Sequence, residues 1–189
     1  MTQLCDIGFK YGTDKCPQIR HTYTPFYYEL FKDKRNKVKK VFEMGIGCPE
    51  NMSKFNNEYK TGASLYMWRE FFPHAKIYGA DILPQAQIKA SRIKTFICDE
   101  LNKDDLKAVI KKVGSDIDLF IDDALHDVAS QVFLCKNMMP LLQRKVIYVI
   151  EDVFTASTVM AQLKEYKCEA PKLKPIRRWY RNNLVVVRK

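Results

Sequence analysis

The sequence predicts an α/β protein in which a mostly parallel β-sheet is covered by helices on both faces. Two observations carry this prediction: short runs rich in Val, Ile, Phe and Tyr recur along the chain, and helical periodicity separates most of them. Strands that alternate with helices are joined by right-handed crossovers, which make neighbouring strands parallel. The six expected strands are residues 38–44, 76–80, 95–98, 117–121, 146–150 and 184–187.

The clearest helix between these strands is expected at residues 127–142. Its apolar residues recur at spacings of four and three, namely Val128, Val132, Cys135, Met139 and Leu142. Asp127 stands at its start, where a negative charge interacts favourably with the helix dipole. Such a helix would cover one face of the sheet.

Length and composition fit a single domain, residues 1–189. With 47% hydrophobic side chains, the chain can build one ordinary core and is too short for two domains of usual size. It has no run of ~18 apolar residues and no basic-then-apolar signal at its start. Its six cysteines lack metal-site spacing. We therefore expect a soluble protein of the cytoplasm with reduced thiols.

The residues that directly follow each expected strand are candidates for function, because ligands of parallel sheets bind beyond the carboxyl ends of the strands. Acidic residues stand at each of the first five of these positions. In chain order, the candidates at these five positions are Glu43 with Gly45 and Gly47, Asp81, Asp99 with Glu100, Asp122 with Asp123 and His126, and Glu151 with Asp152.

The first position carries a glycine turn, E-M-G-I-G, in which Gly45 and Gly47 let the backbone approach a ligand closely. A dinucleotide site would instead show G-x-G-x-x-G leading straight into a helix, whereas Cys48 and Pro49 follow here. This favours a cofactor without a pyrophosphate. S-adenosylmethionine is cationic and suits the acidic Glu43. A purely structural turn is the alternative.

Two further acids complete an expected nucleoside site. Asp81 ends the second strand, where a carboxylate can accept hydrogen bonds from both ribose hydroxyls, and Asp99 would reach the adenine amino group. The gap from Gly47 to Asp81 exceeds the usual ~20 residues, which we attribute to an insertion at 48–61. Each acid taken alone is more often a helix cap or a turn residue.

The fourth and fifth strands should be neighbours, so that Asp123 meets Glu151 and Asp152 at one rim of the sheet. Three carboxylates repel one another unless a cation lies between them. Oxygen ligands favour Mg²⁺, or Mn²⁺ or Ca²⁺, over zinc. Such a metal would hold two adjacent substrate hydroxyls and lower the pKa of the attacking one.

His126 lies three residues beyond Asp123. With an ordinary pKa of ~6.5, its imidazole can take the hydroxyl proton as the oxygen attacks a methyl group. A lone histidine here is more often a capping or surface residue, but the acids on the neighbouring strand favour a catalytic role. His126 and Asp123 are therefore the expected catalytic residues.

The formal charge of +10 favours anionic partners such as nucleic acid, a phosphorylated substrate or an acidic surface. Basic runs at 32–40 and 172–181 hold much of the excess, and such runs are more often solvated surface. In the second run, Arg178 stands beside Trp179 and Tyr180, a combination that can hold phosphate and stack on a ring. Arg178 is a candidate substrate residue.

Several segments resemble a known family. KYGTDK, HTYTPFYYELF, VFEMGIG, GASLYMWREFFPHAKIYGADI, LFIDDALHD and VIYVIEDV are similar to the metal-dependent sugar O-methyltransferases of macrolide biosynthesis. The resemblance runs from about Lys10 to Val187, and its most specific part is D-D-x-x-H followed by E-D. It implies a class I S-adenosylmethionine-dependent methyltransferase, a three-layer Rossmann-like sandwich with a seven-stranded, mostly parallel sheet and an antiparallel last strand.

Carried over residue by residue, the resemblance implies that Asp123, Glu151 and Asp152 bind the metal and that His126 is the general base. The residues it implies for the cofactor are Thr13, Lys15, Glu43, Gly45, Gly47, Ser64, Asp81, Asp99 and Asp122.

The resemblance also divides the chain into an N-terminal segment, residues 1–37, that covers cofactor and substrate, and a core, residues 38–189. Within the first segment, Tyr11, His21 and Tyr23 are the implied substrate residues. Composition alone predicts only an aromatic-rich helix there that docks on the sheet. The chain departs from the family in two respects: it has an insertion at 48–61, and it shows no counterpart of an additional N-terminal domain. The resemblance therefore does not imply which acceptor molecule is methylated or what oligomer the protein forms.

The main hypothesis is a metal-assisted enzyme that transfers a methyl group from S-adenosylmethionine to a hydroxyl of a sugar or glycan. An RNA ribose methyltransferase is the runner-up, motivated by the charge and the run at 172–181. That function would need a lysine-centred site where the sequence has carboxylates. The third hypothesis is a non-catalytic module that binds glycan or nucleic acid and keeps the fold.

Overall fold

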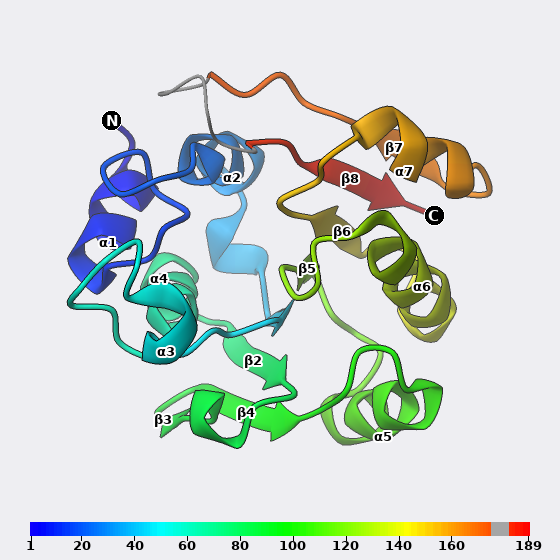
Figure 1. Ribbon diagram of the computed structural model, residues 1–189, viewed down its shortest axis with the longest axis horizontal. Helices are drawn as coiled ribbons and strands as arrows, with labels where there is room; N and C mark the ends of the chain where they lie inside the picture. The colour runs from blue at the N-terminus through cyan, green and yellow to red at the C-terminus, as the bar shows by residue number, and fades with distance from the viewer. Residues whose placement is uncertain (175–181) are drawn as a thin grey trace.

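The computed structural model describes residues 1–174 and 182–189 and shows a β-sheet between two layers of helices (Figure 1). Its strands are β1 (Lys40–Met44), β2 (Lys76–Asp81), β3 (Lys89–Ala90), β4 (Ile93–Ile97), β5 (Leu119–Asp122), β6 (Ile147–Ile150), β7 (Lys167–Glu169) and β8 (Val185–Arg188). Its α-helices are α1 (Gln3–Tyr11), α2 (Tyr23–Phe31), α3 (Pro49–Met52), α4 (Ala63–Phe71), α5 (Lys103–Val113), α6 (Val128–Met138) and α7 (Ala156–Gln162). Short 3-10 turns are η1 (Arg35–Lys37), η2 (Pro84–Ala86) and η3 (Met139–Leu141).

The strand order across the sheet is β3-β4-β2-β1-β5-β6-β8-β7. The five central strands, from β4 to β6, are parallel, and β3, β7 and β8 pair antiparallel with their neighbours. From β1 the chain first builds one side of the sheet through β2 and β4, and then returns to build the other side from β5. The order therefore reverses between β1 and β5, which is where open α/β sheets bind ligands.

The predicted fold class is confirmed. Each of the six expected strands forms within two residues of its expected bounds. The sheet has eight strands in the part of the chain that the structure describes, not seven, because β3 and β7 were not expected. These edge strands are two and three residues long and lack the apolar runs that mark a buried strand.

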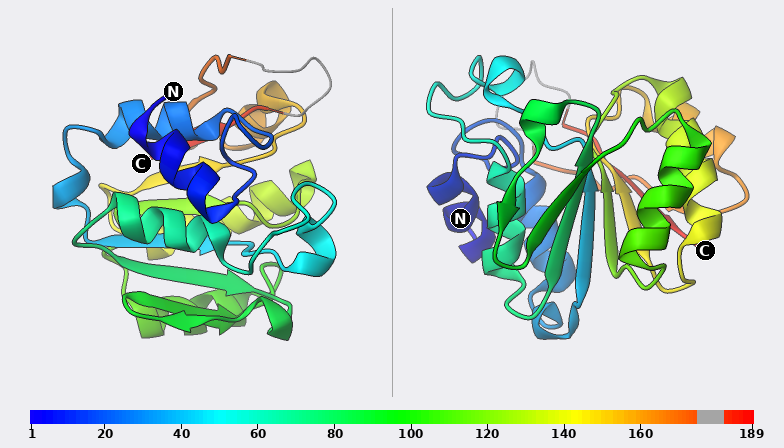
Figure 2. Two further views of the ribbon diagram at one scale, coloured as in Figure 1. Left: turned by 90° about the vertical axis from the view of Figure 1, so that its left-hand side faces the viewer. Right: turned by 90° about the horizontal axis from the view of Figure 1, so that it is seen from below.

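Helices cover both faces of the sheet (Figure 2), and a hydrophobic core lies on each face. Successive residues of a strand point to opposite faces, so Phe42 of β1 packs under α5 and α6, whereas Val41 packs under α4. Phe42 stacks on Phe120 of β5, which stacks on Tyr148 of β6, with ring centroids 5.1 and 4.7 Å apart. These aromatic contacts hold the three central strands in register.

The helix expected at 127–142 is α6 followed by η3. Asp127 caps it by accepting hydrogen bonds from the backbone N–H groups of Ala129 and Ser130. The regular helix stops early because Pro140 has no backbone N–H to donate and its ring clashes with the preceding turn. The cap formed by Asp127 at the start of α6 fixes the end of the loop that carries His126.

The N-terminal segment shares the core of the sheet. Tyr27 and Phe31 of α2 are buried against Trp68 and Phe72 in and after α4, and Phe31 and Phe72 meet edge to face at 5.2 Å. Phe26 and Leu30 of the same helix are partly buried beside them, so the aromatic-rich helix docks on the sheet as expected. This packing places the loop between α1 and α2 against the carboxyl ends of the strands.

No helix within 1–174 or 182–189 is long and apolar enough to cross a membrane. All six cysteines are free thiols, and five of them are buried.

Candidate active site

The loops after β1 and β5 meet at the point where the strand order reverses. The two strands run parallel with Met44 opposite Asp122, so the next residues, Gly45 and Asp123, come together. Gly45 has a φ of 87°, and a Cβ there would collide with the carbonyl oxygen of Asp123 and approach the Cα of Ala124 to 2.7 Å. Only glycine fits this contact.

A cleft of about 490 Å³ opens beside this contact, within the size range of small-molecule sites. Residues from the ends of β1, β2, β4, β5 and β6 line it. The residues predicted from sequence that line this cleft are Gly45, Gly47, Asp81, Asp99, Glu100, Asp123, His126 and Asp152. The fold therefore brings together residues that lie at or directly after the ends of five different strands.

Asp81 fixes the glycine turn. Its Oδ2 accepts hydrogen bonds from the backbone N–H groups of Ile46 and Gly47 at 2.9 and 3.1 Å, and its Oδ1 accepts one from Leu83 at 2.9 Å. Asp99 makes a similar turn, with its Oδ1 accepting from the N–H of Leu101 at 2.9 Å. Carboxylate oxygens accept more than one bond each, so both side chains keep acceptor capacity toward the cleft.

Lys15 lies buried among three carboxylates. Its side chain is 1% exposed, and its ammonium group lies 2.5 Å from Asp123 Oδ2, 2.5 Å from Glu151 Oε2 and 3.3 Å from Glu43 Oε1. Burial alone would lower the pKa of Lys15, but the three negative charges outweigh it and hold the pKa well above its ordinary value. The fold thus supplies a cation of its own to this part of the rim.

The carboxylates around Lys15 have further partners. Glu151 is 0% exposed, and its Oε1 accepts a 2.6 Å hydrogen bond from the hydroxyl of Tyr27. Glu43 accepts a 2.6 Å bond from the indole N–H of Trp68 and one from the hydroxyl of Ser64. Thr13, Lys15, Glu43 and Ser64 surround a cavity of about 80 Å³ that shares Gly45, Gly47 and Asp123 with the cleft.

A second group of polar side chains faces the cleft itself. One ligand atom each from Asp123, His126 and Asp152 lies within 4.8 Å of the others, the only such triad that residues 1–174 and 182–189 form. The Nε2 of His126 is 3.4 Å from Asp123 Oδ1, and its Nδ1 is 3.6 Å from Asp152 Oδ2. Two carboxylates and open positions suit a hard divalent cation. Glu151 lies outside this triad, with its oxygens bonded to Lys15 and Tyr27.

Asp152 is held in a strained backbone conformation. Its φ of 51° lies in the left-handed region, which non-glycine residues seldom adopt and which clusters at functional sites. Tyr23 fixes it from behind, donating its hydroxyl proton to Asp152 Oδ1 at 2.6 Å and accepting the N–H of Asp152 at 3.2 Å. This clamp aims the second carboxylate oxygen of Asp152 at His126.

His126 is half-exposed at the mouth of the group, with 38% of its side chain accessible. Burial lowers its pKa, but the hydrogen bond and the charge of Asp123, with the charge of Asp152, outweigh burial and raise the pKa to about 9. The imidazole therefore holds a proton at neutral pH as long as no metal cation lies beside the two carboxylates. A cation bound beside Asp123 and Asp152 would oppose this effect.

His21 and Tyr23 lie beneath the site and do not line the cleft. Their rings stack with centroids 4.7 Å apart, and His21 Nε2 is 3.5 Å from Asp152 Oδ1. Burial lowers the pKa of His21 to about 4, so it is neutral. Both its ring nitrogens are buried without a hydrogen-bond partner among the residues that the structure describes.

Two of the residues predicted for the site lie elsewhere, and a third is not among the described residues. Asp122 points into the opposite core, where it accepts a bond from Tyr148 at 3.3 Å, because neighbouring residues of β5 face opposite sides of the sheet. Tyr11 donates its hydroxyl proton to Glu70 at 2.8 Å and lines a separate hollow. Arg178 falls outside the described residues.

Sequence reasoning missed other residues of the cleft. Ile82 and Leu125, 59% and 48% exposed, present apolar surface at its edge. The N–H of Leu125 donates a 3.0 Å hydrogen bond to Glu100, which the sequence did predict as a candidate. An apolar residue directly after an acidic strand end is the signal that could have identified Ile82. Tyr27, the partner of Glu151, gave no such signal because it lies within an aromatic-rich segment.

No model of a protein family matches the chain. Over 153 residues it is 32% identical to the mycinamicin VI 2''-O-methyltransferase of Micromonospora griseorubida, which covers 81% of this chain and 36% of the relative. Over 150 residues it is 32% identical to the 8-demethyl-8-(2-methoxy-alpha-L-rhamnosyl)-tetracenomycin-C 3'-O-methyltransferase of Streptomyces olivaceus, covering 79% and 36%. The chain thus spans little more than a third of the length of these relatives.

A solved structure agrees with these relatives. The MycE methyltransferase of the mycinamycin biosynthetic pathway, in complex with Mg and SAH, matches with a TM-score of 0.76 at 25% identity, covering 99% of this chain and 54% of that chain. The chain is therefore a homologue of the macrolide sugar O-methyltransferases and has the fold of class I S-adenosylmethionine-dependent methyltransferases.

Proposed function

We propose that the chain is an S-adenosylmethionine-dependent, divalent-metal-assisted O-methyltransferase that acts on a hydroxyl group of a sugar or glycan. The observation that carries this proposal is the triad of Asp123, His126 and Asp152 at the mouth of the cleft. The relatives of the chain are named for methyl transfer to sugar hydroxyls, and the similar structure of MycE was solved with Mg and SAH.

The cleft suits the methyl donor for reasons independent of these names. Gly45 and Gly47, both at positive φ, bring bare backbone to the cleft. Asp81 and Asp99 offer carboxylate acceptors on one side, and Ile82 and Leu125 offer apolar surface of the kind that packs on a planar ring. We assign Thr13, Lys15, Glu43 and Ser64 to the methionine end, where they surround a small cavity next to the cleft.

We assign Asp123 and Asp152 as the carboxylates that would hold a divalent cation. When bound, such a cation polarises two neighbouring hydroxyl oxygens and lowers the pKa of the attacking one. Glu151 is the third ligand expected from sequence, and for it to serve, Lys15 must release the oxygen that it now contacts at 2.5 Å. Tyr23 would keep Asp152 in place throughout.

In the reaction, the acceptor oxygen attacks the methyl carbon in line with the leaving sulfur, and His126 takes the hydroxyl proton. The bond between carbon and sulfur breaks as the bond between carbon and oxygen forms. Positioning provides much of the rate in such a transfer. The N-terminal segment, residues 1–37, would cover the site, because it already contributes Lys15 and Tyr23 to it. Six free thiols suit a reducing compartment, and we propose the cytoplasm.

Methyl transfer from labelled S-adenosylmethionine to a panel of glycosides, with Mg²⁺ and with EDTA, tests the proposal. We expect turnover with Mg²⁺ and none with EDTA, while calorimetric binding of S-adenosylmethionine persists in both. Equal turnover in EDTA would refute the role of the metal. Transfer to RNA that EDTA leaves unchanged would support the ribose methyltransferase instead, and no binding of S-adenosylmethionine would leave only a non-catalytic module.

A further inference from the structure

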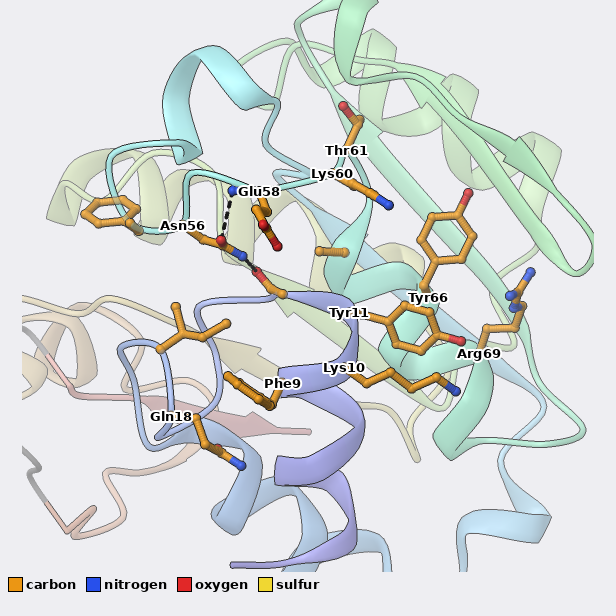
Figure 3. A pocket seen from close by; sticks show the side chains of 14 residues that line it. Phe9, Lys10, Tyr11, Gln18, Asn56, Glu58, Lys60, Thr61, Tyr66 and Arg69 are labelled. Carbon is orange, nitrogen blue, oxygen red and sulfur yellow. Dashed lines mark hydrogen bonds between the residues drawn. The ribbon is translucent and has the colours of Figure 1, made fainter.

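A second hollow lies outside the cleft and is larger than it, with a volume of about 940 Å³ (Figure 3). Helices α1 and α4 form one wall, and the inserted segment at 48–61 forms the other. Glu58 and Lys60 lie on the inserted side, and Phe9 and Tyr11 lie on α1 opposite them. Of its lining residues, Tyr11 alone is among those predicted for the active site.

The inserted segment is docked so that the hollow has a fixed shape. The side-chain amide of Asn56 donates a 3.1 Å hydrogen bond to the backbone oxygen of Gly12, which has a φ of 77°. A Cβ on Gly12 would lie 2.6 Å from that amide nitrogen, so the contact requires glycine. The loop that delivers Lys15 to the active site therefore begins at one edge of the hollow.

The hollow adjoins the cleft through one side chain. Phe55 lines the hollow, the cleft and the small cavity between them. The guanidinium of Arg20, which also lines the cleft, stacks on the Phe55 ring at 3.7 Å from its centroid. A molecule that reacts in the cleft and extends past Phe55 would enter the hollow.

The lining combines aromatic surface with groups that bind hydroxyls. Phe9, which lines the hollow, is 58% exposed. Tyr11 and Tyr66, which also line it, stack with their ring centroids 5.8 Å apart. Exposed aromatic surface of this kind marks binding sites more often than chance. Glu58 and Lys60 make no side-chain hydrogen bond or ion pair with any residue in the described ranges. They can serve as acceptor and donor for a ligand.

Part of the positive charge of the hollow is already engaged by neighbouring groups. Lys10 is already paired with Glu70 at 2.6 Å, and Arg69 donates to the backbone oxygen of Ser91. Of the two remaining charged residues that line the hollow, Glu58 is negative and Lys60 is positive. With Glu70 included, the wall has three cations and two carboxylates, and its polar groups lie beside one exposed and three half-buried aromatic rings. Hydrogen-bonding groups beside aromatic surface suit a hydroxyl-rich ligand with apolar faces, which describes a neutral oligosaccharide.

We propose that this hollow binds the sugar units of a neutral oligosaccharide acceptor that lie beyond the methylated unit. The proposal rests on the function proposed above, because the acceptor must reach the hollow from the cleft. It gives the inserted segment a role in selecting chain length. It also assigns Tyr11 to the distal part of the acceptor, away from the reacting hydroxyl.

The test compares methyl α-L-rhamnoside with a rhamnose tetrasaccharide, both titrated calorimetrically into the protein with S-adenosylhomocysteine and Mg²⁺. We expect the tetrasaccharide to bind about tenfold more tightly, a gain that one well-placed aromatic contact can supply. Tyr66→Ser and Glu58→Ala should each remove most of this gain and leave the monosaccharide affinity unchanged. Lys107→Ala, an exposed change on α5, is the matched control.

Equal affinity for both probes, or a gain that survives both substitutions, would overturn the proposal. Methyl transfer to the two probes is measured separately with S-adenosylmethionine. Turnover without any effect of chain length refutes the oligosaccharide subsite and spares the proposed function. Binding that depends on Tyr66 without turnover refutes the proposed function and spares the subsite.

Discussion

The carboxylates at the carboxyl end of the sheet form two groups, an inner half and an outer half, whose negative charges have different partners. In the inner half, Glu43 and Glu151 are fully buried, and the ammonium group of Lys15 lies between them. In the outer half, Asp152 and His126 face the cleft, and neither forms an ion pair with a lysine or arginine within residues 1–174 and 182–189. Asp123 belongs to both halves, because Oδ2 faces Lys15 and Oδ1 faces His126.

The difference separates a structural task from a chemical one. A buried charge without its partner is costly, so removing a member of the inner half should destabilise the fold. In the outer half, His126 is half-exposed and the three side chains have a ligand site's geometry, so a substitution that keeps their shape should cost activity and little stability. This division makes each half testable with a different readout.

The largest expected effect concerns the outer half. His126→Ala should lower turnover by about 10²- to 10⁴-fold, the usual contribution of a general base. The melting temperature and the calorimetric affinity for S-adenosylmethionine should stay close to wild type, because the side chain is half-exposed. Turnover at the wild-type rate would remove His126 from the mechanism.

The inner half should respond in stability. Lys15→Met leaves three carboxylates without their cation, and we expect a loss of about 3 to 5 kcal/mol in the free energy of unfolding. Urea denaturation measures it, with Lys107→Met as the control, since that ammonium is 63% exposed and its pair with Asp104 should be worth little. Equal midpoints for the two variants would contradict a structural role for Lys15.

The same variant sharpens the proposal for Glu151. Without Lys15, the Oε2 of Glu151 is free to meet a divalent ion. We expect Mg²⁺ to restore part of the stability that Lys15→Met loses and to have a smaller effect on the wild type. No difference between the two proteins on addition of Mg²⁺ would argue against Glu151 as a ligand.

Tyr27→Phe should give a smaller loss. It removes the hydroxyl that donates to Glu151 at 2.6 Å, and a buried hydrogen bond to a charged group is worth about 1.5 to 3 kcal/mol. Tyr28→Phe, one residue along α2, is the matched control, because no hydrogen bond of its hydroxyl is found in the described chain. Similar urea midpoints for both variants would show that the bond contributes nothing.

The smallest effect is a pH dependence at the edge of the cleft. Burial raises the pKa of Glu100 to about 7 from the ordinary 4.5. The folded state therefore binds more protons than the unfolded state between these values, so this group's contribution falls as pH rises from 4.5 to 7. Glu100→Gln should be more stable than wild type by about 1 to 2 kcal/mol at pH 8. The two proteins should converge near pH 4, and a constant difference at both pH values would contradict this assignment.

The sequence was sufficient for the six longer strands and for the acids that follow them, because both follow from local patterns. Buried strands appear as apolar runs, and the acids that line the cleft directly follow them, as Asp81 and Asp99 do. The alternation within β5 could also have separated Asp123, which faces the cleft, from Asp122, which faces the core.

The rest depends on contacts between distant parts of the chain. Lys15 lies 108 residues from Asp123 and 136 from Glu151 in the sequence, so no local pattern predicts that its ammonium would lie between them. The hollow beside the inserted segment is also invisible in the sequence, because it depends on how Asn56 docks on Gly12.

Binding of Mn²⁺, followed by electron paramagnetic resonance, tests the division of the rim most directly. The wild type should bind one ion, and Asp152→Asn should weaken that binding by more than about tenfold while unfolding at nearly the same urea concentration. Asp104→Asn, at an exposed position on α5, should bind as the wild type does. Unchanged Mn²⁺ affinity in Asp152→Asn would contradict the account, because the outer half would then not be the metal site.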